Sequence, residues 1–261
     1  MQSLTVNPII THFDLLWAWT LRTVRARYQQ SVLGALWAVL QPVASVAIFT
    51  VIFTLFIPID TGSIPYVVFS YSAMVPWLFF ATAITDMVES LIINMNLVSK
   101  IYFPREVLPI ASMLARLLDF VIAYGVLFIL LLYFDLPIFT PAWIFLPAIL
   151  LIQLSLVLGI GMIGAAVNVF FRDIKHLFTL GLQLWMYATP IIYPVTTVPE
   201  SIRPYYFLNP MAGIVEAYRA VLLYGQTPAP SLWLSAGLAL VVLTGGYWFF
   251  KRVEFQFADV I

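Results

Sequence analysis

The residues that could carry chemistry in this chain are few and lie far apart. His12 and His176 are its only histidines, and it has no cysteine, so no thiolate nucleophile, disulfide or zinc–thiolate site can form. It contains no His-Glu-x-x-His run, no Gly-x-Ser-x-Gly turn and no Gly-x-x-x-x-Gly-Lys-Ser/Thr phosphate loop. These absences argue against a membrane protease, a zinc enzyme and an ATPase that binds its own nucleotide.

Ionisable residues within apolar sequence form one conspicuous pair, Arg116 and Asp119. Residues three apart on a helix face each other, so we expect a structural intramembrane pair, with Arg116 extending toward the nearer membrane surface. Asp86 and Glu89 fall near the end of an apolar run and are expected at the membrane interface. Because no series of acidic residues crosses the membrane, the sequence gives little support to an ion-coupled mechanism.

The amino-acid composition indicates whether the chain around these residues faces water or lipid. Of 261 residues, 63% are hydrophobic and 9% are charged, whereas a soluble domain carries about 25% charged residues. A soluble fold of this size could not bury so much apolar surface, so most of the chain must face lipid. The 12 basic and 12 acidic residues cancel, so no net charge attracts nucleic acid.

Long uncharged stretches predict the transmembrane helices of an all-α integral membrane protein. There are 32 uncharged residues between Arg27 and Asp60, and 36 between Asp135 and Arg172. A helix needs about 20 apolar residues to cross the hydrocarbon core, so each stretch holds one span. The same criterion over the whole chain predicts six spans, at residues 33–57, 66–91, 108–134, 143–170, 177–193 and 232–250.

Basic residues near the span ends predict the orientation. Nine lie on one side: Arg22, Arg25, Arg27, Lys100, Arg105, Arg172, Lys175, Lys251 and Arg252. The other side has only Arg203 and Arg219, both in its longest connection. Because cytoplasmic loops are rich in lysine and arginine, both termini are expected in the cytoplasm. Trp37 and Trp248 fall at inner span ends, where interfacial aromatic residues are common.

Residues 9–30 precede the first span and have the pattern of an amphipathic helix. Apolar residues recur every three or four positions: Ile10, Phe13, Trp17, Leu21, Val24 and Tyr28. Arg22, Arg25 and Arg27 lie off this stripe, so we expect a helix in the inner membrane interface with its arginines toward lipid phosphates. The periodicity fits a simple membrane anchor and a partner-docking helix equally well.

Two connections are also unusual. The inner loop at 94–107 has a short amphipathic stretch that Pro104 stops, and this predicts a short cytoplasmic helix that meets a soluble partner or lies on the membrane. The outer connection at 194–231 is far longer than an ordinary loop of about 4–6 residues. Within it, residues 212–224 have helical spacing, with Glu216 and Arg219 able to pair. We expect a re-entrant element beside a pathway.

Aromatic and neutral polar side chains remain inside the spans. They are Phe49, Phe53 and Phe56 on one face of the first span, and Gln183 and Tyr187 on one face of the fifth, with Trp185 nearby. These residues are either ordinary helix packing or a surface along which sugars slide, since rings stack on apolar sugar faces while amides and hydroxyls exchange hydrogen bonds. Gly161 and Ala165 permit close helix packing, which specifies no function.

Four segments carry a resemblance to a known family. They are RYQQSVLGALWAVLQP at 27–42, NLVSKIYFPREVLPIA at 96–111, FRDIKHL at 171–177 and LNPMAGIVEAYRAVLLYG at 208–225. In this order they resemble the membrane subunit of ABC-2-type polysaccharide exporters, which export O-antigen, teichoic acid and related lipid-linked glycans. The resemblance covers nearly the whole chain from Arg22 onward, so residues 1–261 are expected to form a single ABC-2-type transmembrane domain.

This resemblance implies a non-enzymatic transport subunit in the cytoplasmic (inner) membrane of a bacterium. It implies a homodimer that exports lipid-linked polysaccharide through a channel at the dimer interface. Two copies of a separate cytoplasmic ATPase would bind ATP and Mg²⁺, and this chain itself would hold no cofactor or metal. The inner loop becomes a coupling helix seated in the ATPase, with contacts from Leu97, Lys100, Ile101, Phe103, Pro104 and Arg105.

The resemblance also assigns the remaining segments. The helix at 9–30, with Arg22, Arg25 and Arg27, becomes an interface helix that adds to the ATPase contact. The first and fifth spans line the channel, and the outer connection becomes a pair of short re-entrant helices between spans five and six that cap it.

Two alternatives stay open on the sequence alone. An ABC-2 exporter of drugs or lipids would share this topology, because aromatic stripes suit drugs and sugars alike. A membrane-embedded enzyme that modifies glycans or lipids would need several acids or histidines facing one another at one membrane surface, and the sequence does not offer them.

Overall fold

The structure is a computed structural model that describes residues 8–29, 31–100 and 103–257. Ile101, which is predicted to contact the ATPase, lies outside these ranges, as does Gln30 at the end of the predicted interface helix. Within the ranges the regular structure is entirely helical: α1 (Pro8–Tyr28), α2 (Trp37–Val51), α3 (Tyr66–Ile93), α4 (Met95–Val98), α5 (Val107–Tyr133), α6 (Leu146–Phe170), α7 (Ile174–Tyr187), α8 (Arg203–Tyr206), α9 (Pro210–Leu222) and α10 (Ser231–Val253). The predicted all-α fold is therefore confirmed for the described part of the chain.

Five segments in these ranges are long and apolar enough to cross a membrane: Gly34–Phe56, Tyr66–Ile93, Val107–Tyr133, Pro141–Phe170 and Ser231–Gln256. They match five of the six predicted spans to within a few residues, and they make the chain a multi-pass membrane protein.

The stretch predicted as the fifth span is different, because α7 has only 14 residues. At 1.5 Å per residue it is about 21 Å long, short of a hydrocarbon core of about 30 Å. Pro190 disfavours helical backbone at the residue before it, and the helix ends at Tyr187.

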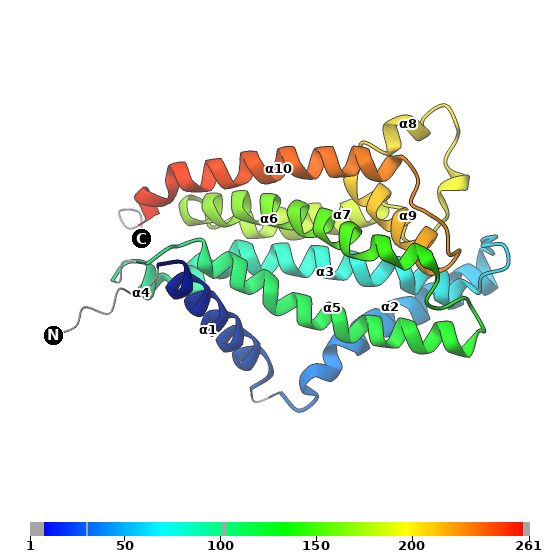
Figure 1. Cartoon of the computed structure of the whole chain (residues 1–261), viewed down its shortest axis with the longest axis horizontal. Helices are drawn as coiled ribbons and strands as arrows, with labels where there is room; N and C mark the ends of the chain where they lie inside the picture. The colour runs from blue at the N-terminus through cyan, green and yellow to red at the C-terminus, as the bar shows by residue number, and fades with distance from the viewer. Residues whose placement is uncertain (1–7, 30, 101–102, 258–261) are drawn as a thin grey trace.

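The centre of the bundle is α3, which α5 and α6 accompany along its length (Figure 1). Most of its residues are buried. Two buried amides of α6 bind backbone carbonyls of α3: Gln153 Nε2 donates to Pro76 at 2.8 Å and Asn168 Nδ2 donates to Val88 at 2.9 Å. Because lipid cannot satisfy a polar side chain, these amides must point into the bundle, and this fixes the rotation of α6 about its own axis.

Glycines let α6 approach its neighbours closely. A side chain at Gly246 of α10 would fall on the backbone of Gly159, and one at Gly159 would fall on the backbone of Val242. Gly161, which the sequence marks as a packing residue, faces Met87 of α3. The α6–α10 contact is thus made by backbone against backbone, as small residues allow in membrane helices.

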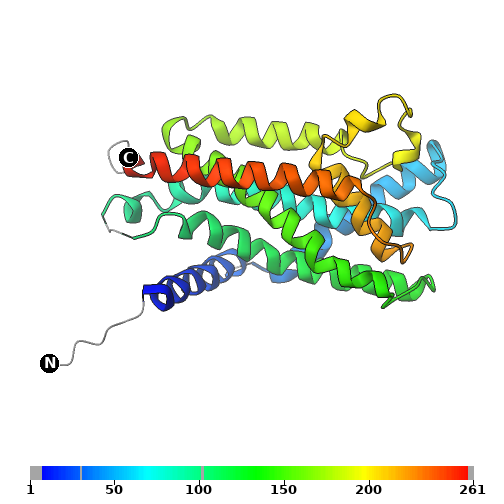
Figure 2. The ribbon, with the colours of Figure 1, turned by 45° about the horizontal axis from the view of Figure 1, so that its top comes forward.

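The helix ends separate into two groups along the bundle. The α3–α5 connection with α4, the α6–α7 turn and the C-terminal end of α10 gather at one end (Figure 1). The α2–α3 and α5–α6 connections and the segment with α8 lie at the opposite end (Figure 2). The loops with the predicted cytoplasmic basic residues therefore share one end, which we call the basic end.

Substitution of Gly246 tests the α6–α10 contact. Gly246→Val should lower the unfolding free energy by about 1–3 kcal/mol, because the added methyl groups force the two backbones apart. The matched control is Gly245→Val, whose Cβ has nothing within 4 Å. The thermal midpoint of the detergent-solubilised protein is the measurement, and equal midpoints for the two variants would contradict the close contact.

Candidate functional site

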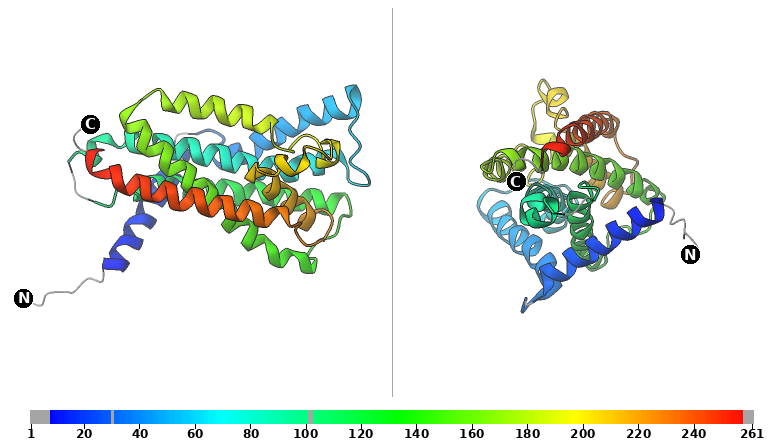
Figure 3. Two further views of the ribbon diagram at one scale, coloured as in Figure 1. Left: turned by 90° about the horizontal axis from the view of Figure 1, so that it is seen from above. Right: turned by 90° about the vertical axis from the view of Figure 1, so that its left-hand side faces the viewer.

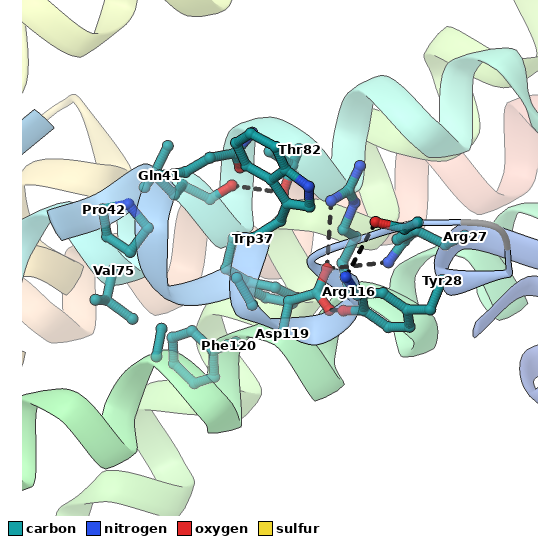
Figure 4. A pocket seen from close by; sticks show the side chains of 16 residues that line it. Arg27, Tyr28, Trp37, Gln41, Pro42, Val75, Thr82, Arg116, Asp119 and Phe120 are labelled. Carbon is teal, nitrogen blue, oxygen red and sulfur yellow. Dashed lines mark hydrogen bonds and ion pairs between the residues drawn. The ribbon is translucent and has the colours of Figure 1, made fainter. Parts of the chain in front are cut away.

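Four charged side chains from three helices meet toward the basic end, and we call them the arginine–aspartate cluster. Arg27 of α1 reaches Asp86 of α3 at 2.5 Å and Asp119 of α5 at 3.0 Å. Arg116 of α5 binds Asp86 through Nε at 2.6 Å and Nη2 at 3.0 Å, and it binds Asp119 through Nη1 at 3.3 Å. The hydroxyl of Tyr28 donates to the second oxygen of Asp119. Figure 4 shows Arg27, Tyr28, Arg116 and Asp119 converging on one another.

The cluster confirms one prediction and corrects another. Arg116 and Asp119 pair across one helical turn, as their spacing predicts. Arg27 does not extend toward lipid phosphates, because α1 packs along α5 and turns its last residues toward the two aspartates. Asp86 joins the cluster through ion pairs to Arg27 and Arg116, which its predicted place at the membrane interface did not include. These partners lie 59 and 92 residues from Arg27, so no local spacing in the sequence could reveal them.

Charge balance explains why the cluster holds together. Two arginines and two aspartates cancel, and their side chains are 15–26% exposed. A charge in a partly dehydrated setting needs a partner, and loss of one partner leaves the other uncompensated. Burial and the bond to Asp119 raise the pKa of Tyr28 to about 12, so its hydroxyl remains a neutral donor. The end of α1 is thereby held to both α3 and α5.

Three hollows open onto the cluster, and Arg116 lines all of them. The first, of about 200 Å³, lies between α1, α2, α3 and α5 and is lined by Trp37 and Gln41 (Figure 4). The second, of about 260 Å³, lies between α3 and α7 and includes Thr85 and Gln183. The third, of about 360 Å³, lies beside α1. The charged side chains of the cluster therefore pair with one another and remain accessible from these hollows.

Helices α2 and α7 lie on the same side of the bundle, and both contact α3 (Figure 3). Both leave an apolar face uncovered, which comprises Trp37, Ile48, Val51 and Leu55 on the first span and Leu177, Leu180 and Leu184 on α7. Gln183 and Tyr187 are exposed on α7, so they remain candidates for lining a pathway. The described chain offers no second helix to cover these faces.

The phenylalanines predicted to share one face of the first span do not do so. Phe49 and Phe53 pack toward the core, and the Phe53 ring lies 5.9 Å from that of Tyr66. Phe56 is 74% exposed. The span ends in a π-helical turn over Ile52–Phe56, in which the wider i to i+5 bonding shifts the direction of each following side chain.

Trp185, a predicted channel-lining candidate, makes packing contacts within this chain. Its ring meets Phe80 edge-on at 5.2 Å and Trp77 at 6.4 Å. Its indole N–H donates to Asn209 Oδ1 at 2.8 Å. Trp185 therefore joins α7 to α3 and to the residue that precedes α9.

The inner loop holds the four-residue helix α4 and then returns to α5. Among the predicted ATPase contacts, Lys100 is exposed, whereas Leu97, Phe103 and Pro104 are half-buried. Arg105 faces its own chain: it donates to the carbonyl of Glu254, beyond α10. Arg105 therefore binds within its own chain and does not project freely toward a partner.

Two ion pairs reinforce that contact. Lys251 of α10 lies 2.8 Å from Glu106 and 3.2 Å from Glu254. The guanidinium of Arg105 also lies 5.9 Å from the centre of the Phe257 ring. We call this set of residues the loop clamp, because it fastens the returning end of the inner loop to the end of α10.

The outer connection folds back into the bundle as α9, which contacts α3, α6 and α10. The predicted pair forms, with Arg219 and Glu216 2.9 Å apart. Arg219 is fully buried: it donates to the carbonyls of Pro190 and Ile191 at 2.5 and 2.8 Å, and it lies 3.6 Å above the Phe69 ring. It thus satisfies carbonyls just beyond α7, where the helix has ended and lipid could not satisfy them.

A family model described as "ABC-2 type transporter" matches residues 14–223 of the chain. That match covers the cluster, both uncovered helix faces, the inner loop and α9. The chain belongs to the ABC-2 type transporter family. The family resemblance carried by the four sequence segments is thereby confirmed.

Similar proteins over nearly the full length are transport permeases. The chain is 30% identical to the O-antigen export system permease protein RfbA of Myxococcus xanthus, over 98% of each protein. It is 28% identical to the RfbA permease of Klebsiella pneumoniae, over 95% of each. It is 28% identical to the polysialic acid transport protein KpsM of Escherichia coli, over 90% of this chain and 91% of KpsM. These names agree with a transport subunit and not with an enzyme.

Substitution of Arg27 tests the charge balance. Arg27→Ala leaves one aspartate uncompensated, so it should lower the unfolding free energy by about 1–3 kcal/mol. Arg25→Ala, at an exposed position of the same helix, should have no such effect. Combining Arg27→Ala with Asp119→Asn restores neutrality and should recover part of the loss.

The measurement is the thermal midpoint of the four proteins in lipid nanodiscs. Equal midpoints for the Arg25 and Arg27 variants would contradict a stabilising role for the cluster.

Proposed function

We propose that this chain is the membrane subunit of an ATP-driven exporter of lipid-linked polysaccharide, in the cytoplasmic membrane of a bacterium. The observation that carries the proposal is the full-length similarity to permeases named for O-antigen export and polysialic acid transport. The gathering of the basic loops at one end of the bundle supports a cytoplasmic location for that end and for both termini (Figure 1).

The working unit we propose is a homodimer with its pathway between the two copies. The uncovered faces of α2 and α7 support this, because only 11% of the most apolar window of Gly34–Phe56 is buried within one chain. A two-fold axis would bring the same faces of both copies together. In this arrangement α7 and the chain after it complete the sixth crossing, which the short helix alone does not reach.

The exposed side chains on these faces suit sugars. Phe56 and Tyr187 present aromatic rings, and Gln183 presents an amide. Rings stack on the apolar faces of pyranoses while amides and hydroxyls exchange hydrogen bonds with sugar hydroxyls. Phe49, Phe53 and Trp185 then support this lining from behind.

Energy would come from a separate ATPase, present as two copies that bind ATP and Mg²⁺. This chain has no phosphate loop, so nucleotide chemistry must take place on another polypeptide. The exposed Lys100, with Leu97 beside it, and the exposed Arg22 and Arg25 of α1 are the proposed contacts. ATP can change the pathway only if the ATPase binds its two states differently.

In this scheme the ATPase pushes the inner loop and α1 when it closes on ATP. The loop clamp carries motion from the loop to α10, and the arginine–aspartate cluster carries motion from α1 to α3 and α5. Arg105 is thus a positioning residue that holds the loop, and Lys100 is the residue that meets the partner.

Charge reversal at Lys100 tests this division of roles. Lys100→Glu should lower glycan-stimulated ATP turnover about tenfold, the effect of losing about 1.4 kcal/mol of contact energy. Its thermal midpoint should not change, because the side chain is exposed. Arg252→Glu, another exposed basic residue at the same end, is the control. An unchanged turnover in Lys100→Glu would contradict the assigned contact.

Reconstitution tests the function itself. The chain should co-purify with an ATPase, and the pair in proteoliposomes should hydrolyse ATP faster when the host's lipid-linked glycan is added. Stimulation by drugs or by glycan-free lipids, without stimulation by the glycan, would replace the proposal with the alternative ABC-2 exporter. Glycan modification without an ATPase would replace it with the enzyme alternative.

A further inference from the structure

The hollow between α1, α2, α3 and α5 has a polar wall and an apolar wall (Figure 4). The polar wall consists of Tyr28 and three members of the cluster, Arg27, Arg116 and Asp119, and Ser31 and Gln41 extend it. The apolar wall consists of Pro42, Val75, Leu78, Phe79 and Phe120. It lies where α1 meets the start of α2, on the way from the basic end to the uncovered face of the first span.

The two arginines have hydrogen-bond donors to spare. Each guanidinium carries five N–H groups, and the two together make five hydrogen bonds to Asp86 and Asp119. About half of their donors therefore have no partner in the described part of the chain. Arg27 and Arg116 both line the hollow, so part of each guanidinium faces it.

The balanced charge of the polar wall favours neutral hydrogen-bond acceptors over anions. Arg27 and Arg116 are already neutralised by the two aspartates at 2.5–3.3 Å. A phosphate or pyrophosphate would add uncompensated negative charge next to those carboxylates, which partial burial makes costly. A neutral ligand rich in hydroxyl and ether oxygens accepts the spare N–H groups without disturbing that balance.

Trp37 supplies the group that such a ligand would stack on. Its side chain lines the hollow and is 51% exposed. Gln41 follows one helical turn later on the same face of α2 and also lines the hollow. An exposed indole beside an amide and planar guanidinium groups is the combination that binds a pyranose, whose ring has apolar faces and a polar rim.

We propose that this hollow is a sugar-binding site at the inner entrance of the pathway. Trp37 stacks on one face of a neutral sugar residue, Gln41 binds its hydroxyls, and the spare N–H groups of Arg27 and Arg116 donate to its oxygens. The proposal rests on the proposed function, because it assigns the hollow to the exported glycan. It makes Trp37 a residue that determines affinity for the cargo.

Binding to the purified complex of this chain with its ATPase, in nanodiscs, tests the site. The probe is the oligosaccharide released by mild acid from the host's lipid-linked glycan, and titration calorimetry gives its dissociation constant. Trp37→Ala should weaken binding about tenfold, Trp37→Phe should weaken it less, and Gln41→Ala should weaken it measurably. Trp248→Ala is the matched control, because Trp248 is an exposed indole on α10 that lies outside the hollow.

The outcomes separate the site from the proposed function. No binding to the unsubstituted complex, or equal affinities for the Trp37→Ala and Trp248→Ala complexes, overturns the site, whatever the export result. Inorganic pyrophosphate that displaces the oligosaccharide overturns it in favour of an anion site. If lipid-linked glycan stimulates ATP turnover equally in the unsubstituted and Trp37→Ala complexes, the function stands and only the site fails.

Discussion

Lipid offers no partner to a charge or a backbone dipole, and the arginine–aspartate cluster is where this constraint shapes the molecule most. Asp86, Arg116 and Asp119 alone would carry an excess negative charge at the edge of the bundle. Arg27, from α1, supplies the missing positive charge. The same ion pairs therefore attach the end of α1 and balance the charge of the cluster.

The same constraint organises the other polar groups. Gln153 and Asn168 bind carbonyls of α3 and set the rotation of α6, whereas Arg219 binds the carbonyls left open beyond α7. Each of these residues joins segments that are far apart in sequence. Apolar packing fills the space between the helices, but these few directional contacts determine which packing is adopted.

The sequence predicts whatever depends on local pattern. Uncharged stretches located five spans to within a few residues, and three-residue spacing predicted the pairs Arg116–Asp119 and Glu216–Arg219. Contacts that depend on tertiary packing were out of reach. No pattern near Arg27 predicts its ion pair with Asp86, and no pattern near Arg105 predicts its hydrogen bond to Glu254. The inward turn of Trp185 depends on Asn209, and the displaced Phe56 depends on a π-helical turn that has no distinctive composition.

The loop clamp has a mechanical consequence. Arg105 and Glu106 are bound to the end of α10. A force on the inner loop would therefore act on two helices, on α5 directly and on α10 through the loop clamp. At Gly159 of α6 and Gly246 of α10, the backbones of the two helices are in direct contact. Little side chain lies between them that could deform. In the proposed cycle, a small displacement of the inner loop would reach α6 through this backbone contact without a large deformation of any single helix.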